Sequence, residues 1–346
     1  MAAAPKRPVR RSQRARLEDI ARQFDVSIAT VSRALSDQPG VRADLKARIR
    51  DAALRFSYAL PSPVAGRRAI VAASSAAMVD YTRSQFTLHV LEGIAERAKT
   101  LGMEIETRSI ANAEQGRALL DEARAADDVA GLLFLTLDDE AMLAPTRGHP
   151  KPIVLVNGDD PSMRLSSVAP CNRAAAALAT DHLRALGHER ILFLMRRGRR
   201  TIERRFEGWR DRMPAMDHAR LTDLVVEVDD WLPELAQAAI ERRLDWRGRD
   251  FSAILAAGDS LAIGAAMGLA ARGIKVPEEV SIIGMDGLPQ GAFANPPLSA
   301  VVMPMREIGS VALDLLRDKA SGAETTPRRV ELACHLLERK STGRAR

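Results

Sequence analysis

The sequence predicts a small all-helical head at its N-terminus, followed by a larger α/β body with parallel sheets. Charge is the first indication: residues 1–68 hold 15 Lys and Arg against six Asp and Glu, a net charge of +9, whereas the remainder holds 36 against 39, a net charge of −3. Periodicity is the second, because the head repeats apolar residues at helical spacing and the body alternates apolar runs with amphipathic segments. A chain of 346 residues has room for two or three such folding units.

Apolar residues spaced at i, i+3, i+4 and i+7 predict three short helices in the head, over residues 17–24, 28–35 and 43–56. Asp25 lies in the tight turn between the first two helices. Ser27 follows it as a good N-cap, because its hydroxyl can accept a hydrogen bond from a free N–H of the second helix. Two short helices joined by a three-residue turn and closed by a third are typical of a helix-turn-helix, whose second helix enters the major groove of DNA.

The outer face of the second helix carries the groups that such a role needs. Ile28 and Ala29 would face base edges, Thr30 and Ser32 would reach phosphates, and Arg33 can pair with guanine O6 and N7. The alternative is a small helical bundle with a solvated basic surface, which the charge distribution argues against. The residues expected to bind DNA are Ser27, Ile28, Ala29, Thr30, Ser32, Arg33 and Arg42.

The stretch "LEDIARQFDVSIATVSRALSDQPGV" resembles the head of the lactose/galactose repressor family of bacterial transcription regulators. The shared pattern is an aliphatic-x-D-[VI]-A start, a V-S-x-x-T-V-S-R core and a later Val. Asp25 stands where the family usually has Gly. Like Gly, Asp tolerates the left-handed backbone conformation. Arg42 and Leu45 stand where Ser and Thr are commoner.

The linker after the head departs further from the family. There the resemblance implies a hinge helix that orders on operator DNA and inserts a Leu into the minor groove. Here the sequence is "YALPSPVAGRR", which has no Leu at the wedge position and holds two prolines and a glycine. We therefore expect an extended linker over 59–68. It follows a basic disordered tail at 1–15 and a DNA-binding domain at 16–58, and it precedes an effector-binding and dimerisation body at 69–340.

The body alternates β-like and α-like segments. Buried strands are expected at 131–135, 153–156, 191–195 and 253–256, with helices between them, among them one at 205–213. Such βα alternation predicts parallel sheets covered on both faces. About 270 residues suffice for two similar lobes, with a ligand in the cleft at the carboxyl ends of the strands.

The body resembles the same family, and this implies a two-lobed fold like that of periplasmic sugar-binding proteins. The runs that carry the resemblance are "TDHLRALGHERI" at 180–191, "VPEEVSIIGMD" at 276–286 and "PPLS" at 296–299. Matching the family's motifs position by position implies an effector site whose residues are Phe86, Asn157, Arg205, Trp231, Asp259 and Asp286.

In the family the Arg of R-x-x-G anchors an effector hydroxyl or carboxylate, and Arg205 matches it. Asp259 matches an acceptor for vicinal hydroxyls, and Trp231 falls where an aromatic ring often faces a sugar. Cys171 and Met285 replace residues common in the family, so the cleft differs from one built for a common hexose. The basic run 196–200, "RRGRR", has two readings: a grip for a phosphorylated or acidic effector, or a solvated loop.

These observations predict a sequence-specific DNA-binding transcription regulator, and specifically a repressor, controlled by a sugar or sugar derivative. The partners would be double-stranded operator DNA and a second copy of the chain, with a tetramer as the larger alternative. A competing hypothesis is a ligand-insensitive DNA-binding protein whose body serves only dimerisation.

An enzyme is disfavoured because the chain has no G-x-G-x-x-G, P-loop or G-x-S-x-G motif. No cofactor or metal is expected, since Cys171 and Cys334 match no metal-ligand spacing. There is no apolar run long enough to cross a membrane and no secretory signal, which together favour a cytoplasmic, nucleoid-associated protein.

Overall fold

The computed structural model describes residues 13–35, 39–55, 63–75, 78, 81–215, 217–323 and 326–346. The chain divides into two units. One contains the head together with Leu101–Met103, and the other contains the rest of the body from Arg68 onward. Each unit is described by itself.

The head consists of three helices, α1 (Gln13–Gln23), α2 (Ile28–Leu35) and α3 (Ala43–Arg55). The bounds of α2 are those predicted, whereas α1 begins at Gln13, so the expected tail over 1–15 is three residues too long. The helices enclose one apolar cluster, whose fully buried members include Ile20, Val31 and Ile49. Three helices this short depend on that shared cluster, because isolated helices of such length are marginal in water.

The turn between α1 and α2 is fixed by backbone hydrogen bonds. The Val26 N–H donates to the Ala21 carbonyl at 3.0 Å and the Asp25 N–H to the Arg22 carbonyl at 3.4 Å, the pairing of a Schellman helix end. Asp25 takes the left-handed conformation this motif requires, with φ of 53°, as expected for the residue in place of Gly. Ser27 then caps α2, its Oγ accepting from the Thr30 N–H at 3.0 Å.

The first four residues of the predicted linker, 59–62, lie outside the described residues, and the other six are described. Pro63 to Gly66 form a turn, and the Val64 side chain is fully buried.

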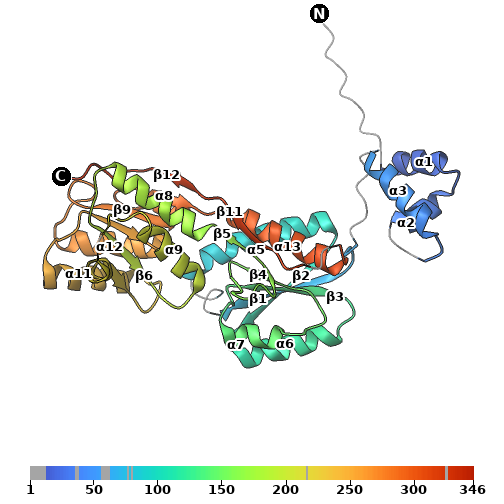
Figure 1. Cartoon of the computed structure of the whole chain (residues 1–346), viewed down its shortest axis with the longest axis horizontal. Coiled ribbons are helices and arrows are strands. Elements are labelled where there is room, and N and C mark those ends of the chain that lie inside the picture. The colour runs from blue at the N-terminus through green and yellow to red at the C-terminus, as the bar shows by residue number, and fades with distance from the viewer. Residues whose placement is uncertain are drawn as a thin grey trace, which may run out of the picture. The chain divides into compact units, whose positions relative to one another are not determined.

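The body contains two six-stranded sheets, one in each lobe (Figure 1). The first lobe has the strand order β11-β5-β4-β3-β1-β2, and its neighbouring strands pair in parallel. Figure 1 shows α5 and α13 over one face of this sheet and α6 and α7 over the other. The elements of this lobe are β1 (Arg68–Ser74), α5 (Tyr81–Leu101), β2 (Glu104–Ile110), α6 (Ala113–Ala125), β3 (Val129–Leu135), α7 (Glu140–Leu143), η1 (Ala144–Thr146), β4 (Ile153–Val156), β5 (Ser166–Pro170), α13 (Met305–Ala320) and β11 (Arg329–Leu332).

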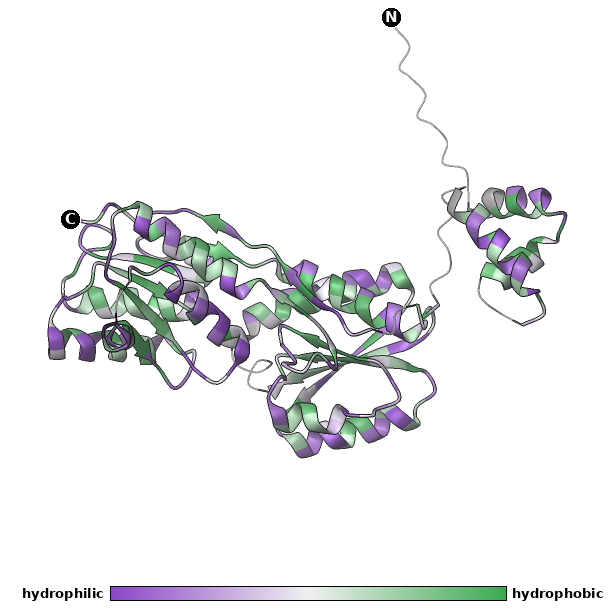
Figure 2. Cartoon of the chain, in the orientation of Figure 1, coloured by the Kyte–Doolittle hydropathy of each residue, from purple (hydrophilic) through white to green (hydrophobic). Residues whose placement is uncertain are grey.

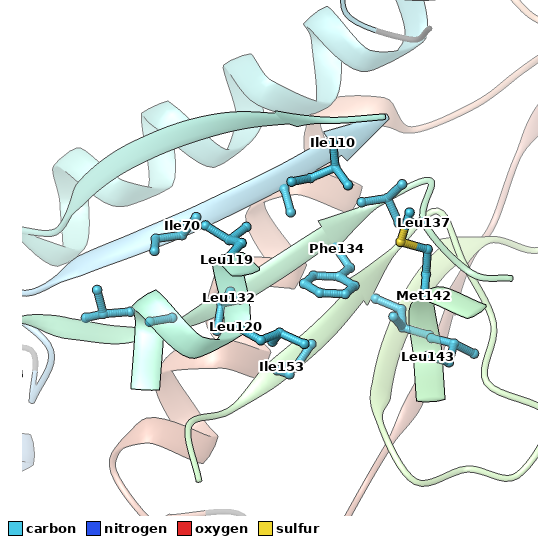
Figure 3. Close-up of a cluster of buried hydrophobic side chains, with 14 residues drawn as sticks. Ile70, Ile110, Leu119, Leu120, Leu132, Phe134, Leu137, Met142, Leu143 and Ile153 are labelled. Atoms are coloured by element: carbon cyan, nitrogen blue, oxygen red, sulfur yellow. The ribbon is translucent and has the colours of Figure 1, made fainter. Parts of the chain in front are cut away.

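The core of the first lobe gathers around Phe134 of β3 (Figure 3). Leu119 and Leu120 of α6 and Met142 of α7 pack against it together with Ile70 of β1. Strands β3 and β4 are buried at every position. Figure 2 shows the strands of the sheets as hydrophobic and the flanking helices as mixed, which is the pattern of parallel sheets covered on both faces.

The second lobe has the strand order β12-β10-β9-β8-β6-β7. Its helices pack in pairs, α8 against α9 and α11 against α12. Its elements are α8 (Asn172–Ala185), β6 (Ile191–Met195), α9 (Arg200–Arg210), α10 (His218–Asp223), β7 (Val225–Glu227), α11 (Pro233–Arg247), β8 (Ala253–Ala256), α12 (Asp259–Ala271), β9 (Ser281–Asp286), η2 (Pro289–Phe293), β10 (Ser299–Val302) and β12 (His335–Leu337).

The predicted two-lobed α/β body with parallel sheets is confirmed, with one exception: β12 pairs antiparallel with β10. Only Ala333 and Cys334 separate β11 in the first lobe from β12 in the second. The strands of both lobes point their carboxyl ends toward the cleft. A strand that leaves one lobe and directly enters the other therefore runs against its new neighbours.

The chain crosses between the lobes three times. The crossings lie between β5 and α8, between β10 and α13, and between β11 and β12. They leave the carboxyl ends of both sets of strands facing one cleft, where an open α/β sheet places its ligand.

Candidate functional site

A cavity of about 400 Å³ lies between the two lobes. The first lobe contributes side chains from the ends of its strands and from α5, among them Phe86, Thr136 and Asn157. Phe86 lies within α5, which begins five residues before it, at Tyr81. The second lobe contributes Trp231 and Asp286, among others. The volume is that of a site for a small molecule.

Three residues on the lining have a strained backbone. Thr136, Asn157 and Asp286, each at or just beyond the end of a strand, have φ of 59°, 51° and 139°. Positive φ costs of order 1–3 kcal/mol for a residue other than Gly, and it persists where the surroundings require it. The strain aims these side chains into the cavity, a common arrangement at ligand sites.

Arg205 is the most deeply buried cation on the lining, with 4% of its surface exposed. Its Nε donates to Asn172 Oδ1 at 2.7 Å, one terminal nitrogen donates to the Ala257 carbonyl, and the same nitrogen lies 3.7 Å from Asp286 Oδ1. Burial lowers the pKa of Arg205, and the Asp286 charge opposes that shift. The guanidinium is therefore held in one orientation before any ligand binds.

Asp259 and Asp286 form a buried carboxyl pair beside Arg205. The Asp259 N–H points at Asp286 Oδ2 at 3.4 Å, and Asp259 Oδ2 accepts from the Leu288 N–H at 2.7 Å. Burial raises the pKa of Asp259 to about 7, aided by the Asp286 charge, and raises that of Asp286 to about 6 against the opposing Arg205 charge. The two carboxyls therefore titrate together near neutral pH.

This pair predicts a pH dependence of stability. In the unfolded chain both carboxyls would ionise near pH 4, whereas the folded protein keeps protons bound up to about pH 6–7. The contribution to the free energy of unfolding is therefore fully present below about pH 4 and is lost as pH rises to about 7. Asp259→Asn should flatten the urea-unfolding profile over that window. Asp127→Asn, at an exposed turn, should leave the profile as in the wild type, and an unchanged Asp259→Asn profile would contradict the pairing.

Two glycines allow this packing. A Cβ on Gly284 would lie 2.4 Å from Asp259 Oδ1, and a Cβ on Gly258 would lie 3.2 Å from the Trp231 ring. Both positions therefore accept no side chain unless the carboxyl pair or the ring moves.

Ion pairs join the lobes across the cleft. The Arg199 Nε lies 3.1 Å from Asp138 Oδ1, and Arg204 lies 3.0 Å from Asp159 Oδ2. Arg200 approaches the same Asp159 oxygen at 3.3 Å. The carboxylates belong to the first lobe and the guanidiniums to the second, so these pairs stabilise the arrangement of the lobes seen here.

The basic run 196–200 therefore divides between its two readings. Arg197 is solvated and pairs with Glu227 at 2.6 Å, as a surface loop would. Arg199 and Arg200 turn toward the first lobe, and Arg196 lines the cavity with its Nε donating to the Asp229 carbonyl at 3.3 Å.

In the head, one side of α2 is buried and the other is exposed. Val31, Ala34 and Leu35 are buried, whereas the Ile28 side chain is 39% exposed. The side chains exposed on that face or at its edge are Ser27, Ile28, Ala29, Ser32 and Arg33. An apolar side chain left exposed beside hydroxyls and a guanidinium is the composition of a surface that reads DNA bases.

Two expected DNA contacts are engaged within the head itself. The Thr30 hydroxyl lies 2.9 Å from Ser27 Oγ, and the Arg33 Nε donates to the Ala29 carbonyl at 3.3 Å. Arg42 is exposed at the start of α3, 3.9 Å from Asp44 Oδ1.

Two family models match this sequence. The model for bacterial regulatory proteins of the lacI family matches residues 16–60, and the model for a periplasmic binding protein-like domain matches residues 180–342. The HTH-type transcriptional regulator reg1 of Streptomyces lividans is 29% identical, covering 95% of this chain and 97% of its own. The chain belongs to the LacI family of bacterial regulatory proteins. The HTH-type transcriptional repressor CytR of Escherichia coli is 28% identical, covering 95% of this chain and 96% of its own.

Solved structures of transcription regulators share the fold. The complex of the transcriptional regulator CelR with cellobiose aligns with a TM-score of 0.70 at 24% identity, covering 94% of this chain and 99% of that one. The lac repressor dimer bound to operator and the anti-inducer ONPF aligns with a TM-score of 0.68 at 23% identity, covering 94% and 98%.

Within this LacI-family body, the structure brings five of the six expected effector residues to one cavity: Phe86, Asn157, Arg205, Trp231 and Asp286. Asp259 is set behind the lining, 2% exposed, where it holds the Leu288 backbone. Sequence reasoning missed Thr136 and Thr201 on the lining. Thr201 escapes it because the sequence pattern predicts that its helix begins at Arg205, whereas α9 begins five residues earlier, at Arg200.

Two features are absent from the described part of the chain. No helix there is long and apolar enough to cross a membrane. Nor do three or more His, Cys, Asp or Glu side chains gather there as a metal site.

Proposed function

We propose that this LacI-family member is a repressor that binds operator DNA through α2. Its affinity for the operator falls or rises when a small polar effector fills the cavity between the lobes. One observation supports this proposal most strongly: the same chain has an exposed face on α2 that can contact DNA bases and a cavity of about 400 Å³ between two lobes. Relatives named as transcriptional regulators and repressors match this chain over nearly its whole length.

The face of α2 supports specific roles. Ile28 and Ala29 would contact base edges, Ser27 and Ser32 would donate to phosphates, and Arg33 would pair with a guanine. Thr30 is best placed to hold the Ser27 cap, since their hydroxyls lie 2.9 Å apart. Arg42, exposed at the start of α3, would add a phosphate contact.

The cavity supports a sugar-like effector, and the relative CelR has been solved in complex with the sugar cellobiose. Trp231 offers an aromatic face, and Asp286 and Asn157 offer acceptors for hydroxyl hydrogens. A ligand there touches both lobes, so its binding energy acts on the same arrangement that the Asp138 and Asp159 ion pairs stabilise.

Two heads are needed to read a palindromic operator, so we propose a homodimer, with a tetramer as the larger assembly. Binding to an operator places the protein on chromosomal DNA, in the cytoplasm at the nucleoid. The competing function, a DNA-binding protein insensitive to ligand, is favoured by the prolines of the linker.

The test is an operator titration with and without ligands. Selection from random duplexes provides the operator, and fluorescence anisotropy measures its affinity while a panel of sugars, sugar acids and sugar phosphates is added. We expect at least one compound to change operator affinity, by a factor of roughly 5–150. Specific operator binding that no compound in the panel alters would favour the ligand-insensitive function, and the absence of any selected sequence would overturn the regulator.

A further inference from the structure

The start of α9 opens into the cavity. Arg199 is its N-cap residue but makes no capping hydrogen bond with its side chain, and the Arg199 carbonyl accepts from the Ile202 and Glu203 N–H groups. The N–H groups that remain without a partner within α9 are therefore those of Arg200 and Thr201, and such groups carry a partial positive charge. Such a helix end can bind an oxyanion.

Thr201, in the first turn of α9, is an independent indication of a ligand. It lines the cavity, it is only 2% exposed, and its Oγ1 has no hydrogen-bond partner among the described residues. A buried hydroxyl without a partner costs about 1–3 kcal/mol. An acceptor on the ligand would remove that cost.

The charge on the lining points to the same ligand chemistry. Arg205 is paired with Asp286, and Arg199 is paired with Asp138 behind the lining. Arg196 donates to a backbone carbonyl, and within the described chain no carboxylate lies within ion-pair distance of it. Of the three lining guanidiniums, Arg199 and Arg205 thus have carboxylate partners, and Arg196 has none among the described residues.

We propose that the effector is anionic and that its phosphate or carboxylate binds at the start of α9, on the Thr201 hydroxyl, the first amide N–H groups of the helix and the Arg196 guanidinium. The proposal rests on the proposed function, since it assigns the chemical class of that effector. The neutral part of the ligand would then extend toward Trp231 and Asp286.

Inorganic phosphate is the first probe, used with the full-length protein. At matched ionic strength, phosphate should raise the melting temperature relative to chloride and change the fluorescence of the protein, since Trp231 lines the site. Thr201→Val and Arg196→Gln should each weaken phosphate binding by roughly tenfold. Arg197→Gln, whose side chain is solvated and paired with Glu227, should bind as the wild type does.

The free proteins provide the control for folding. Thr201→Val removes an unpartnered hydroxyl, so without phosphate it should melt at or above the wild-type temperature; a lowered value would indicate a structural role. The proposal is overturned if phosphate leaves the wild type unchanged, or if Arg197→Gln weakens binding as much as Arg196→Gln.

Matched pairs of compounds separate the two anion sources and the underlying function. Glucose, glucose 6-phosphate and gluconate are compared for binding and for their effect on the operator complex. Binding of glucose 6-phosphate or of gluconate that is tighter than binding of glucose identifies the anionic group as a phosphate or a carboxylate. A neutral sugar that binds as tightly as its anionic counterpart and alters operator affinity would overturn the anionic effector while leaving the effector-controlled regulator intact.

Discussion

The Asp159→Asn protein is expected to be less stable than the wild type by about 2–4 kcal/mol and to bind its effector about tenfold more weakly. Asp159 is 4% exposed and forms ion pairs with Arg200 and Arg204 of the second lobe and with Arg329 of the first. An asparagine has the same shape but no charge, so it removes all three attractions at once. Breaking a buried pair typically costs about 3–5 kcal/mol. The loss is smaller here because the three guanidiniums are partly exposed and can rehydrate.

The effect on the effector follows from the position of these ion pairs. They join the lobes next to the cavity of the proposed effector site, and we expect the effector to bind the arrangement of the lobes that they stabilise. Without these ion pairs, part of the free energy of effector binding is used to bring the lobes together. A loss of about 1.4 kcal/mol of binding free energy lowers the affinity tenfold.

Urea unfolding measures the stability, and small-angle scattering measures whether the cleft opens. Asp245→Asn is the matched control, because its pair with Arg272 joins exposed side chains within one lobe. That control should lose no more than about 1 kcal/mol. Equal losses of unfolding free energy in the two variants would contradict a role for Asp159 in holding the lobes together. A radius of gyration unchanged by Asp159→Asn would contradict it as well.

Local sequence patterns predicted the elements that are stabilised by neighbouring residues in the sequence and the strands that are completely buried. Helix α2 and strands β4, β6 and β8 have the predicted bounds, because each is a compact apolar or capped segment bordered by residues that end it. The turn at Asp25 was predicted for the same reason, since its left-handed conformation depends on its immediate neighbours.

The elements that sequence reasoning missed depend on distant partners. Strands β11 and β12 are short, partly exposed edges, and their pairing partners are more than 30 residues away. The first turn of α9 reads as a charged loop because Arg200 and Arg204 find their carboxylate only across the cleft, at Asp159. Since Thr201 lies in that first turn and lines the cavity, the missed boundary also concealed its part in the proposed anion site.

The effector residues show the same limit. Motif matching implied that Asp259 accepts from the vicinal hydroxyls of the effector and that Asp286 only lines the cleft. The structure separates them by depth, because Asp259 Oδ2 is engaged by the Leu288 N–H and Asp286 reaches the lining. Gly284 leaves the space that Asp259 occupies, because a Cβ there would lie 2.4 Å from Asp259 Oδ1.

Arg33→Ala is expected to weaken operator binding by about 10- to 100-fold, corresponding to about 1–3 kcal/mol, and to weaken binding to random duplex much less. Arg33 is exposed on α2, next to Ile28 and Ala29 on the face that points away from the core of the head. Without DNA its Nε donates to the Ala29 carbonyl at 3.3 Å, a bond to an exposed turn that a guanine can replace at little cost.

Arg42→Ala provides the contrast that separates base reading from phosphate contact. It should weaken binding to operator and to random duplex by similar factors and make the salt dependence shallower by about one ion. Arg33→Lys should recover part of the affinity, because a lysine keeps the charge and loses the two-pronged geometry. If Arg33→Ala lowered both affinities equally while the head remained folded by circular dichroism, α2 would be anchored on the backbone, and the bases would be read by other residues of the head.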